Sequence, residues 1–104
     1  MIRTEDLIAN GYSVYSNETD NADIVYGKRI INEEGLTLYH INICGYLKKT
    51  EPKMWDFDVK ISTKVRGNYL HFYVMDMIET TTIKEIEEKS NSAWLVLNAE
   101  PFEE

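Results

Sequence analysis

The stretch that decides the fold of this chain is Met54-Trp55-Asp56-Phe57-Asp58-Val59-Lys60-Ile61. Apolar and polar residues alternate along it, and the apolar positions hold Trp55, Phe57, Val59 and Ile61. Because successive side chains of a β-strand point to opposite faces, the pattern predicts a strand with one buried and one solvated face. A register shift of one residue would move Trp55 into water and Asp56 into the core, so we expect a fixed register.

Length and composition predict one globular domain. The chain has 104 residues, 43% of them hydrophobic, which is enough for a single core. No run approaches the roughly 20 apolar residues of a membrane-spanning helix, and residues 1–6 lack the apolar core of a signal peptide. Cys44 has no second cysteine with which to form an intramolecular disulfide, which favours a reducing compartment. We therefore expect a cytoplasmic protein.

The charge is acidic and unevenly distributed. Eleven basic and 18 acidic residues give a net charge of −7, which argues against nucleic acid and anionic membranes as direct ligands. Residues 83–104 contain two basic and six acidic residues, so this last fifth of the chain carries −4 of the total. A protein partner, if there is one, is expected to be basic.

The N-terminal region is predicted to start with a short helix. We expect it over residues 5–10, with Thr4 as N-cap, Gly11 at the C-terminal cap, and Leu7 and Ile8 facing inward. Further along, the pattern predicts an edge strand (12–16), a polar loop (17–21), a strand (24–32) and a return strand (36–47).

Glycine positions and alternation refine these strands. The turn Asn32-Glu33-Glu34-Gly35 joins the two longer ones, and Gly27 predicts a bulge or a close backbone approach. On the return strand one face is expected to hold Tyr39, Ile41 and Ile43, and the other His40, Asn42 and Cys44.

A loop over residues 48–53 precedes the strand quoted first, and a second turn over residues 64–68 follows it. The next strand is expected over residues 69–75. Its core-facing residues would be Leu70, Phe72 and Val74, with Tyr69, His71 and Tyr73 on the opposite face.

The C-terminal region changes to a helical period. Thr82 and Glu85 fit a capping box, and the apolar stripe that follows predicts a helix over residues 83–98 that lays Ile86, Trp94 and Leu97 on the sheet. The alternative ends the helix near Ser90 and makes residues 93–97 a strand. An acidic tail over about residues 100–104 is expected to be mobile.

These elements predict an α+β fold: an antiparallel meander of four or five strands, with a short N-terminal helix and a C-terminal helix packed on one face.

Few residues suggest catalysis. His40 and Cys44 would lie about 13 Å apart on one strand, too far to share a metal ion directly, although His71 could approach His40 across strands. No feature marks the Cys44 thiol as activated. Asp56 and Asp58 would lie about 7 Å apart on one face, a spacing compatible with a solvated face, a partner contact or a catalytic acid pair. We expect no catalytic residues, no metal and no cofactor.

Aromatic and histidine residues suggest a second surface of interest. Tyr69, His71 and Tyr73, with His40 and Tyr26 beside them, predict an amphipathic sheet face that would serve for ordinary packing, ligand binding or dimerisation.

Residues 24–61 carry a resemblance to a group of proteins. The segments Val25-Tyr26-Gly27-Lys28-Arg29-Ile30, Tyr39-His40-Ile41-Asn42-Ile43 and Trp55-Asp56-Phe57-Asp58-Val59 together resemble small uncharacterised accessory proteins of bacteriophages and prophages. The resemblance implies a protein that binds and disables a host factor in the host cytoplasm. It assigns no catalytic residue.

Two functional classes follow. The first is a non-enzymatic protein-binding module, of the inhibitor, immunity or DNA-mimic type, that presents Glu85, Glu88, Asp56 and Asp58 to a basic partner. The second is a small ligand-binding protein or enzyme that uses the Tyr/His face. A structural or self-associating role, such as a homodimer, is a third reading.

Overall fold

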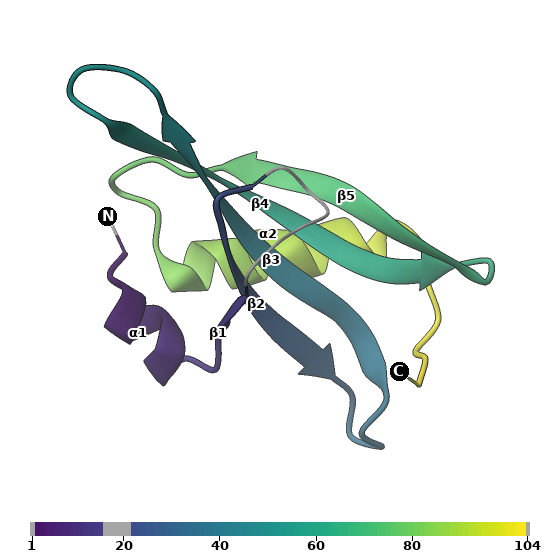
Figure 1. The fold of residues 1–104 in the computed structure, drawn as a ribbon. Helices are drawn as coiled ribbons and strands as arrows, with labels where there is room; N and C mark the ends of the chain where they lie inside the picture. Colours follow the sequence, from purple (N-terminus) through teal and green to yellow (C-terminus); the bar gives the residue numbers. More distant parts are fainter. Residues whose placement is uncertain (1, 16–21, 104) are drawn as a thin grey trace.

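The computed structural model describes residues 2–15 and 22–103, and the loop expected over residues 17–21 lies outside the described residues. In chain order the elements are α1 (Thr4–Ala9), β1 (Ser13–Tyr15), β2 (Ile24–Ile31), β3 (Thr37–Lys48), β4 (Met54–Val65), β5 (Asn68–Asp76) and α2 (Ile83–Leu95), as Figure 1 shows.

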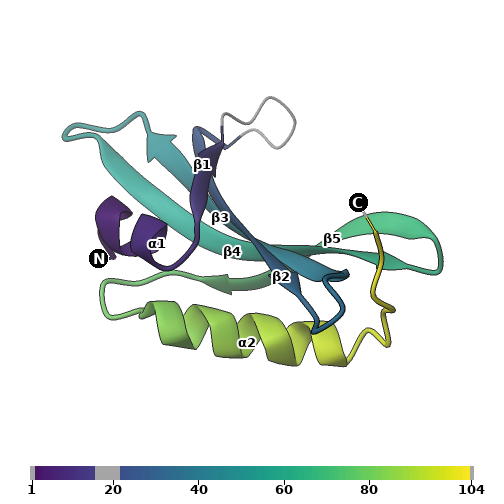
Figure 2. The same cartoon turned by 90° about the horizontal axis from the view of Figure 1, so that it is seen from below.

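Within the described residues the strands form one five-stranded antiparallel sheet in the order β1-β2-β3-β4-β5. Every strand therefore pairs with its neighbours in sequence, which is a meander. The long helix α2 lies along one face of this sheet (Figure 2), and the other face is called the open face below. The predicted α+β class is confirmed.

Both predicted hairpin turns are present. In the first, the backbone amides of Glu34 and Leu36 each donate a hydrogen bond to Asn32 Oδ1 at 2.9 Å. The second is a two-residue turn in which Arg66 (φ 53°) and Gly67 (φ 81°) both adopt positive φ, the geometry that matches the twist of paired strands.

Gly27 is a close approach and not a bulge. A Cβ at this position would lie 2.4 Å from Cε2 of the Tyr15 ring, which packs over the glycine. The irregularities in strand pairing fall elsewhere: Leu38 on β3 and Val74 on β5 are each skipped in the register with the neighbouring strand. The bulge at Val74 is not visible in the alternation of the sequence.

The helix α2 begins where the sequence predicts. The Thr82 side chain accepts a hydrogen bond from the backbone amide of Glu85 at 3.1 Å. The helix ends at Leu95, three residues earlier than predicted, because the chain turns away at Asn98, whose φ is 52°. The alternative of a strand over residues 93–97 is wrong.

The core lies between α2 and the sheet. Its fully buried side chains include Ile41, Ile43, Val59, Ile61 and Ile86, each no more than 1% exposed. On the helix side, the rings of Trp94 and Tyr39 pack with centroids 5.6 Å apart.

Two residues predicted to face the core are largely outside it. Trp55 is 43% exposed and Leu70 is 41% exposed, although each lies on the face that α2 covers elsewhere. The physical reason is length: α2 spans about 20 Å, whereas β4 spans about 40 Å, so the strand ends extend past the helix.

The N-terminal helix α1 differs in two details from its prediction. Its N-cap is Arg3, and the Thr4 hydroxyl lies 2.9 Å from the Tyr26 hydroxyl in a hydrogen bond instead of capping the helix. Leu7 is buried as predicted, but Ile8 is 55% exposed, because only one side of this six-residue helix contacts the sheet.

The C-terminal segment returns to the sheet. Phe102, in the tail expected to be mobile, exchanges two backbone hydrogen bonds of 2.9 Å with Thr37 and is thereby fixed against the start of β3. None of the helices in the described residues is long and apolar enough to cross a membrane.

Candidate functional site

The Tyr/His end of the open face is a hydrogen-bonded network. Strand register places His40, Ser62 and His71 in one row across β3, β4 and β5. Ser62 Oγ lies 2.6 Å from His71 Nδ1 and accepts a hydrogen bond from Asn42 Nδ2 at 2.8 Å. The predicted approach of the two histidines therefore occurs through a serine placed between them.

Tyr69 completes this network. Its hydroxyl lies 3.0 Å from His40 Nδ1, and its ring packs edge-on against His71 and Phe102 with centroid distances of 5.6 and 6.1 Å. Since these polar atoms bond one another, the arrangement is that of a structural network. Tyr26, expected on this face, lies on the opposite one and is only 7% exposed.

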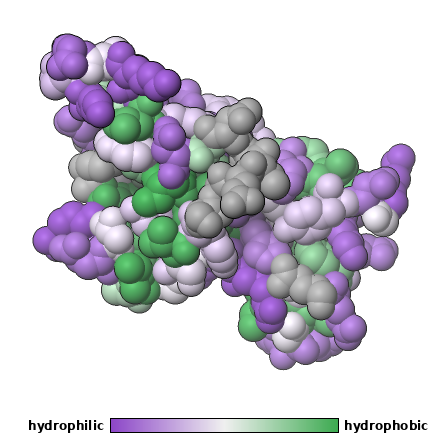
Figure 3. Space-filling view, viewed as in Figure 1, coloured by the Kyte–Doolittle hydropathy of each residue, from purple (hydrophilic) through white to green (hydrophobic). Residues whose placement is uncertain are grey.

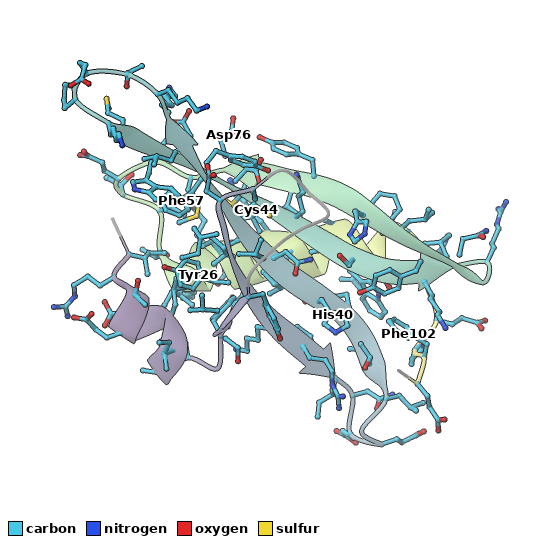
Figure 4. The ribbon with its side chains drawn as sticks, in the orientation of Figure 1. Tyr26, His40, Cys44, Phe57, Asp76 and Phe102 are labelled. Atoms are coloured by element: carbon cyan, nitrogen blue, oxygen red, sulfur yellow. The ribbon has the colours of Figure 1, made fainter. Side chains whose placement is uncertain are left out.

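The other end of the open face contains an acidic cleft of about 380 Å³ at the base of the β3–β4 hairpin. Its lining residues are Tyr46, Asp56, Phe57, Asp58, Asp76 and Met77. In Figure 4 the labelled Asp76 lies at this end of the sheet, whereas His40 and Phe102 lie near the other end.

Two carboxylates of the cleft lie directly across from each other. The register pairs Asp58 on β4 with Asp76 on β5. Burial raises the pKa of Asp58 above its ordinary value, and the neighbouring Asp76 raises it further, against the opposing effects of Lys60 and the Tyr46 hydroxyl. Asp58 Oδ1 is buried and has no hydrogen-bond partner in the described structure.

Two lysines lie near the cleft, and each already has a partner among its lining residues. Lys60 Nζ donates to the Tyr46 hydroxyl at 3.0 Å and lies 5.7 Å from the centroid of that ring. Lys48 forms an exposed salt bridge of 2.9 Å with Asp56. In the part of the chain that the structure describes, no salt bridge reaches Asp58 or Asp76, and Lys60 offsets the charge of Asp58 only in part, so the cleft keeps an excess of negative charge.

The four acidic residues expected to bind a partner do not form one surface. Asp56 and Asp58 lie on the open face, whereas Glu85 and Glu88 lie on α2, which packs on the opposite face. Glu88 is 3.8 Å from Lys84 in an exposed salt bridge along the helix. A single flat partner could contact one pair or the other.

Two residues of the cleft were missed by the sequence reasoning. Asp76 joins Asp58 only through the β4–β5 register, and Tyr46 joins Asp56 through the β3–β4 register. Pairing the predicted strands outward from the predicted loop over residues 48–53 places Tyr46 opposite Trp55, one residue away from Asp56. The same procedure misplaces Asp76 by one residue, because the bulge at Val74 shifts the register.

The described residues offer little for covalent or metal chemistry. Cys44 lies on the open face but is only 1% exposed, because it packs with Ala22 and Val25. Among residues 2–15 and 22–103, no group of three or more His, Cys, Asp or Glu side chains is arranged to hold a metal ion. What the cleft can do is bind a cationic group between carboxylates.

Comparison with known proteins adds no relative: no family model, no curated protein and no solved structure matches this chain.

Proposed function

We propose that this protein is a small acidic protein-binding module, and that the acidic cleft receives a lysine or arginine side chain of a basic partner protein. The observation that carries the proposal is the Asp58–Asp76 pair, two facing carboxylates of which one has a buried oxygen without a hydrogen bond.

The energetic argument concerns the cost of keeping this pair. A buried acceptor left unsatisfied costs about 1–3 kcal/mol, and like charges directly opposite on paired strands destabilise a sheet. A guanidinium or ammonium group in the cleft would remove both penalties, since it donates hydrogen bonds and neutralises charge. The unbound cleft is thus prepared for a cation.

Apolar surface beside the cleft fits a protein partner better than a small cation. The hairpin carries Met54, 58% exposed, and Trp55, whose ring stacks on Phe57 with centroids 5.8 Å apart. Figure 3 shows apolar side chains gathered between this hairpin and α1. Aromatic residues beside charged anchors are typical of protein interfaces.

The remaining acidic residues fit a role in the approach of the partner. Exposed charges such as Glu85 and Glu88 act mainly on association rate and are screened beyond about 8 Å at physiological salt. The resemblance to phage accessory proteins makes a host factor, disabled by binding, the kind of partner we propose.

The cleft can be tested before a partner is known. N-acetyl-lysinamide and N-acetyl-argininamide, titrated into ¹⁵N-labelled protein, should shift the amide resonances of residues around Asp58 and Asp76 with millimolar affinity. The variant Asp58→Asn/Asp76→Asn should lose these shifts, and the matched helix variant Glu85→Gln/Glu88→Gln should keep them. Equal shifts in both variants would exclude the cleft as the binding site.

A second experiment uses the partner itself. Affinity capture from the native host uses wild-type protein and the two double variants as bait. Wild type and the helix variant should retain the same basic protein, and the cleft variant should not. Association rates measured over a salt series should fall several-fold at high salt for wild type. A partner retained equally by all three baits would refute the assignment.

A further inference from the structure

The two edges of the sheet are unequal. One edge is β1, with three residues, and the other is β5, with nine. A strand edge presents unpaired backbone groups that can pair with another chain, and natural proteins protect it with short strands, lysine, proline or inward-pointing charge. The edge at β1 has the first of these protections because it is short.

The edge at β5 lacks most of them. Residues 68–75 contain no Lys, Arg, Asp, Glu or Pro. Tyr69, Leu70 and Tyr73 on this strand are 45%, 41% and 59% exposed. Within the described chain β5 is the last strand of the sheet, so no further strand covers its outer edge.

We propose that β5 pairs antiparallel with β5 of a second copy of this chain, about a two-fold axis that passes beside His71. The sheets of the two copies then join into one continuous sheet. Asp76 of the acidic cleft lies at the end of the same strand, but the self-association does not depend on the proposed function.

The sequence of β5 is self-complementary about His71. In this register Tyr69 faces Tyr73 of the second copy, and Leu70 faces Phe72 of the second copy. Aromatic–aromatic and aromatic–aliphatic pairs across antiparallel strands each contribute favourably. The paired stretch of residues 69–73 ends immediately before the bulge at Val74, which bends the strand and disrupts the ladder locally.

Charge selects a second copy as the occupant. Each chain carries a net charge of −7, so two copies repel unless they meet where charge is absent. Residues 68–75 form such a neutral strip, and Asp76 lies beyond the bulge. A strongly basic partner would gain nothing from this edge, whereas a second copy avoids a like-charge contact there.

A five-residue ladder is a small interface, so the dimer should be weak. We expect half-association at about 0.1–1 mM, in line with interfaces well below standard size. Sedimentation equilibrium over this concentration range should show monomer and dimer. A monomer at all concentrations up to about 1 mM overturns the proposal.

Disulfide trapping tests the register. His71→Cys places two thiols across the axis with Cα atoms about 4.5–5.5 Å apart, which is within disulfide reach. Tyr73→Cys is the matched control, because its own copy lies about 13 Å away along the strands. Mild oxidation should cross-link the first variant and not the second. The native Cys44 is buried, so wild type should remain uncross-linked.

A mixture gives a sharper result. Tyr69→Cys and Tyr73→Cys should each stay monomeric on a non-reducing gel when oxidised alone, and should cross-link when mixed in equal amounts. Equal cross-linking of every β5 variant, alone or mixed, indicates random collision and overturns the register.

A charged residue at the two-fold axis should dissociate the dimer. His71→Lys brings two ammonium groups face to face and should weaken association at least tenfold, whereas Tyr15→Lys on the opposite edge should leave it unchanged. Dimerisation that persists in His71→Lys, or that is lost in Tyr15→Lys, would show that β5 is not the interface.

Discussion

The two halves of β4 share one pattern of alternating residues but differ in how deeply their side chains are buried. Ile61, in the second half, is fully buried beneath α2, whereas Trp55, in the first half, is 43% exposed. The alternation is the same throughout, so it reports which face a side chain takes. How deeply that side chain is buried depends on what covers the face, and α2 is about half as long as the strand.

The difference in burial along β4 also bears on the proposed function. The buried half of β4 supplies the core, and the projecting half supplies Asp56 and the half-exposed Trp55 to the proposed docking surface. Because β4 is longer than the helix that covers it, the proposed docking surface projects from the domain that anchors the strand.

Truncation in the covered half should have the largest effect. Ile61→Ala removes a side chain that is 0% exposed and should lower the free energy of unfolding by about 2–5 kcal/mol. The urea midpoint of unfolding measures this directly. A loss below about 1 kcal/mol would show that the centre of β4 is not the packed core described here.

The same experiment on the projecting half should give a smaller loss, in spite of the larger side chain. Trp55→Ala removes a half-exposed ring whose stacking partner is Phe57, and we expect a cost of about 1–2 kcal/mol, well below the 3–5 kcal/mol for a core aromatic. In wild type, acrylamide should quench Trp55 more strongly than Trp94. A cost equal to that of Ile61→Ala would remove the contrast between the halves.

Much of the fold was predictable because it is encoded locally. The turns at Asn32–Gly35 and Arg66–Gly67 and the N-cap at Thr82 depend on residues within a few positions of each other. The meander then follows, since strands joined by tight turns pair with their neighbours. Trp55 and Leu70 were misplaced because their burial depends on the length of α2, a distant element.

The candidate site was predictable only in part. Asp56 and Asp58 are adjacent on one strand, so their shared face could be derived from alternation. The position of Asp76 opposite Asp58 depends on a bulge at Val74, which no residue type in β5 predicts. Tyr26 was placed on the wrong face because the phase of β2 relative to β3 is set by pairing, not by either strand alone.

Weakening α2, the helix that covers the sheet, tests how much this helix contributes to the stability of the domain. Thr82→Ala removes the hydroxyl that accepts the Glu85 amide and should cost about 1 kcal/mol, as for other N-caps. Amide hydrogen exchange should speed up in the first turn of α2. The exposed Thr80→Ala is the matched control and should change the stability by less than about 0.5 kcal/mol. Equal losses in both would mean that the cap does not hold the helix.

The smallest change in the free energy of unfolding is expected for Asp58 on the open face, and the direction of this change is informative. Because burial raises the pKa of Asp58 in the folded state above its ordinary value of 3.8, the unfolded chain releases this proton first as pH rises. Stability contributed by the protonated form is therefore complete below pH 3.8 and is lost as pH rises through the folded pKa. Asp58→Asn lacks this loss, so it should match wild type at low pH and be slightly more stable at pH 7.

The gain should stay below about 1 kcal/mol, since the carboxylate is only partly buried. Asp56→Asn is the control: its carboxylate is exposed and salt-bridged to Lys48, so removing it should give no gain. Urea midpoints of unfolding at pH 3.5, 5 and 7, measured for wild type, Asp58→Asn and Asp56→Asn, test both expectations. If Asp58→Asn is more stable at pH 7 and also loses binding of lysine and arginine amides, then the chain keeps a destabilising carboxylate because the partner needs it, as expected where function costs stability. If the variant is less stable than wild type at pH 7, the carboxylate is satisfied in the free protein and the acidic cleft is not prepared for a cation.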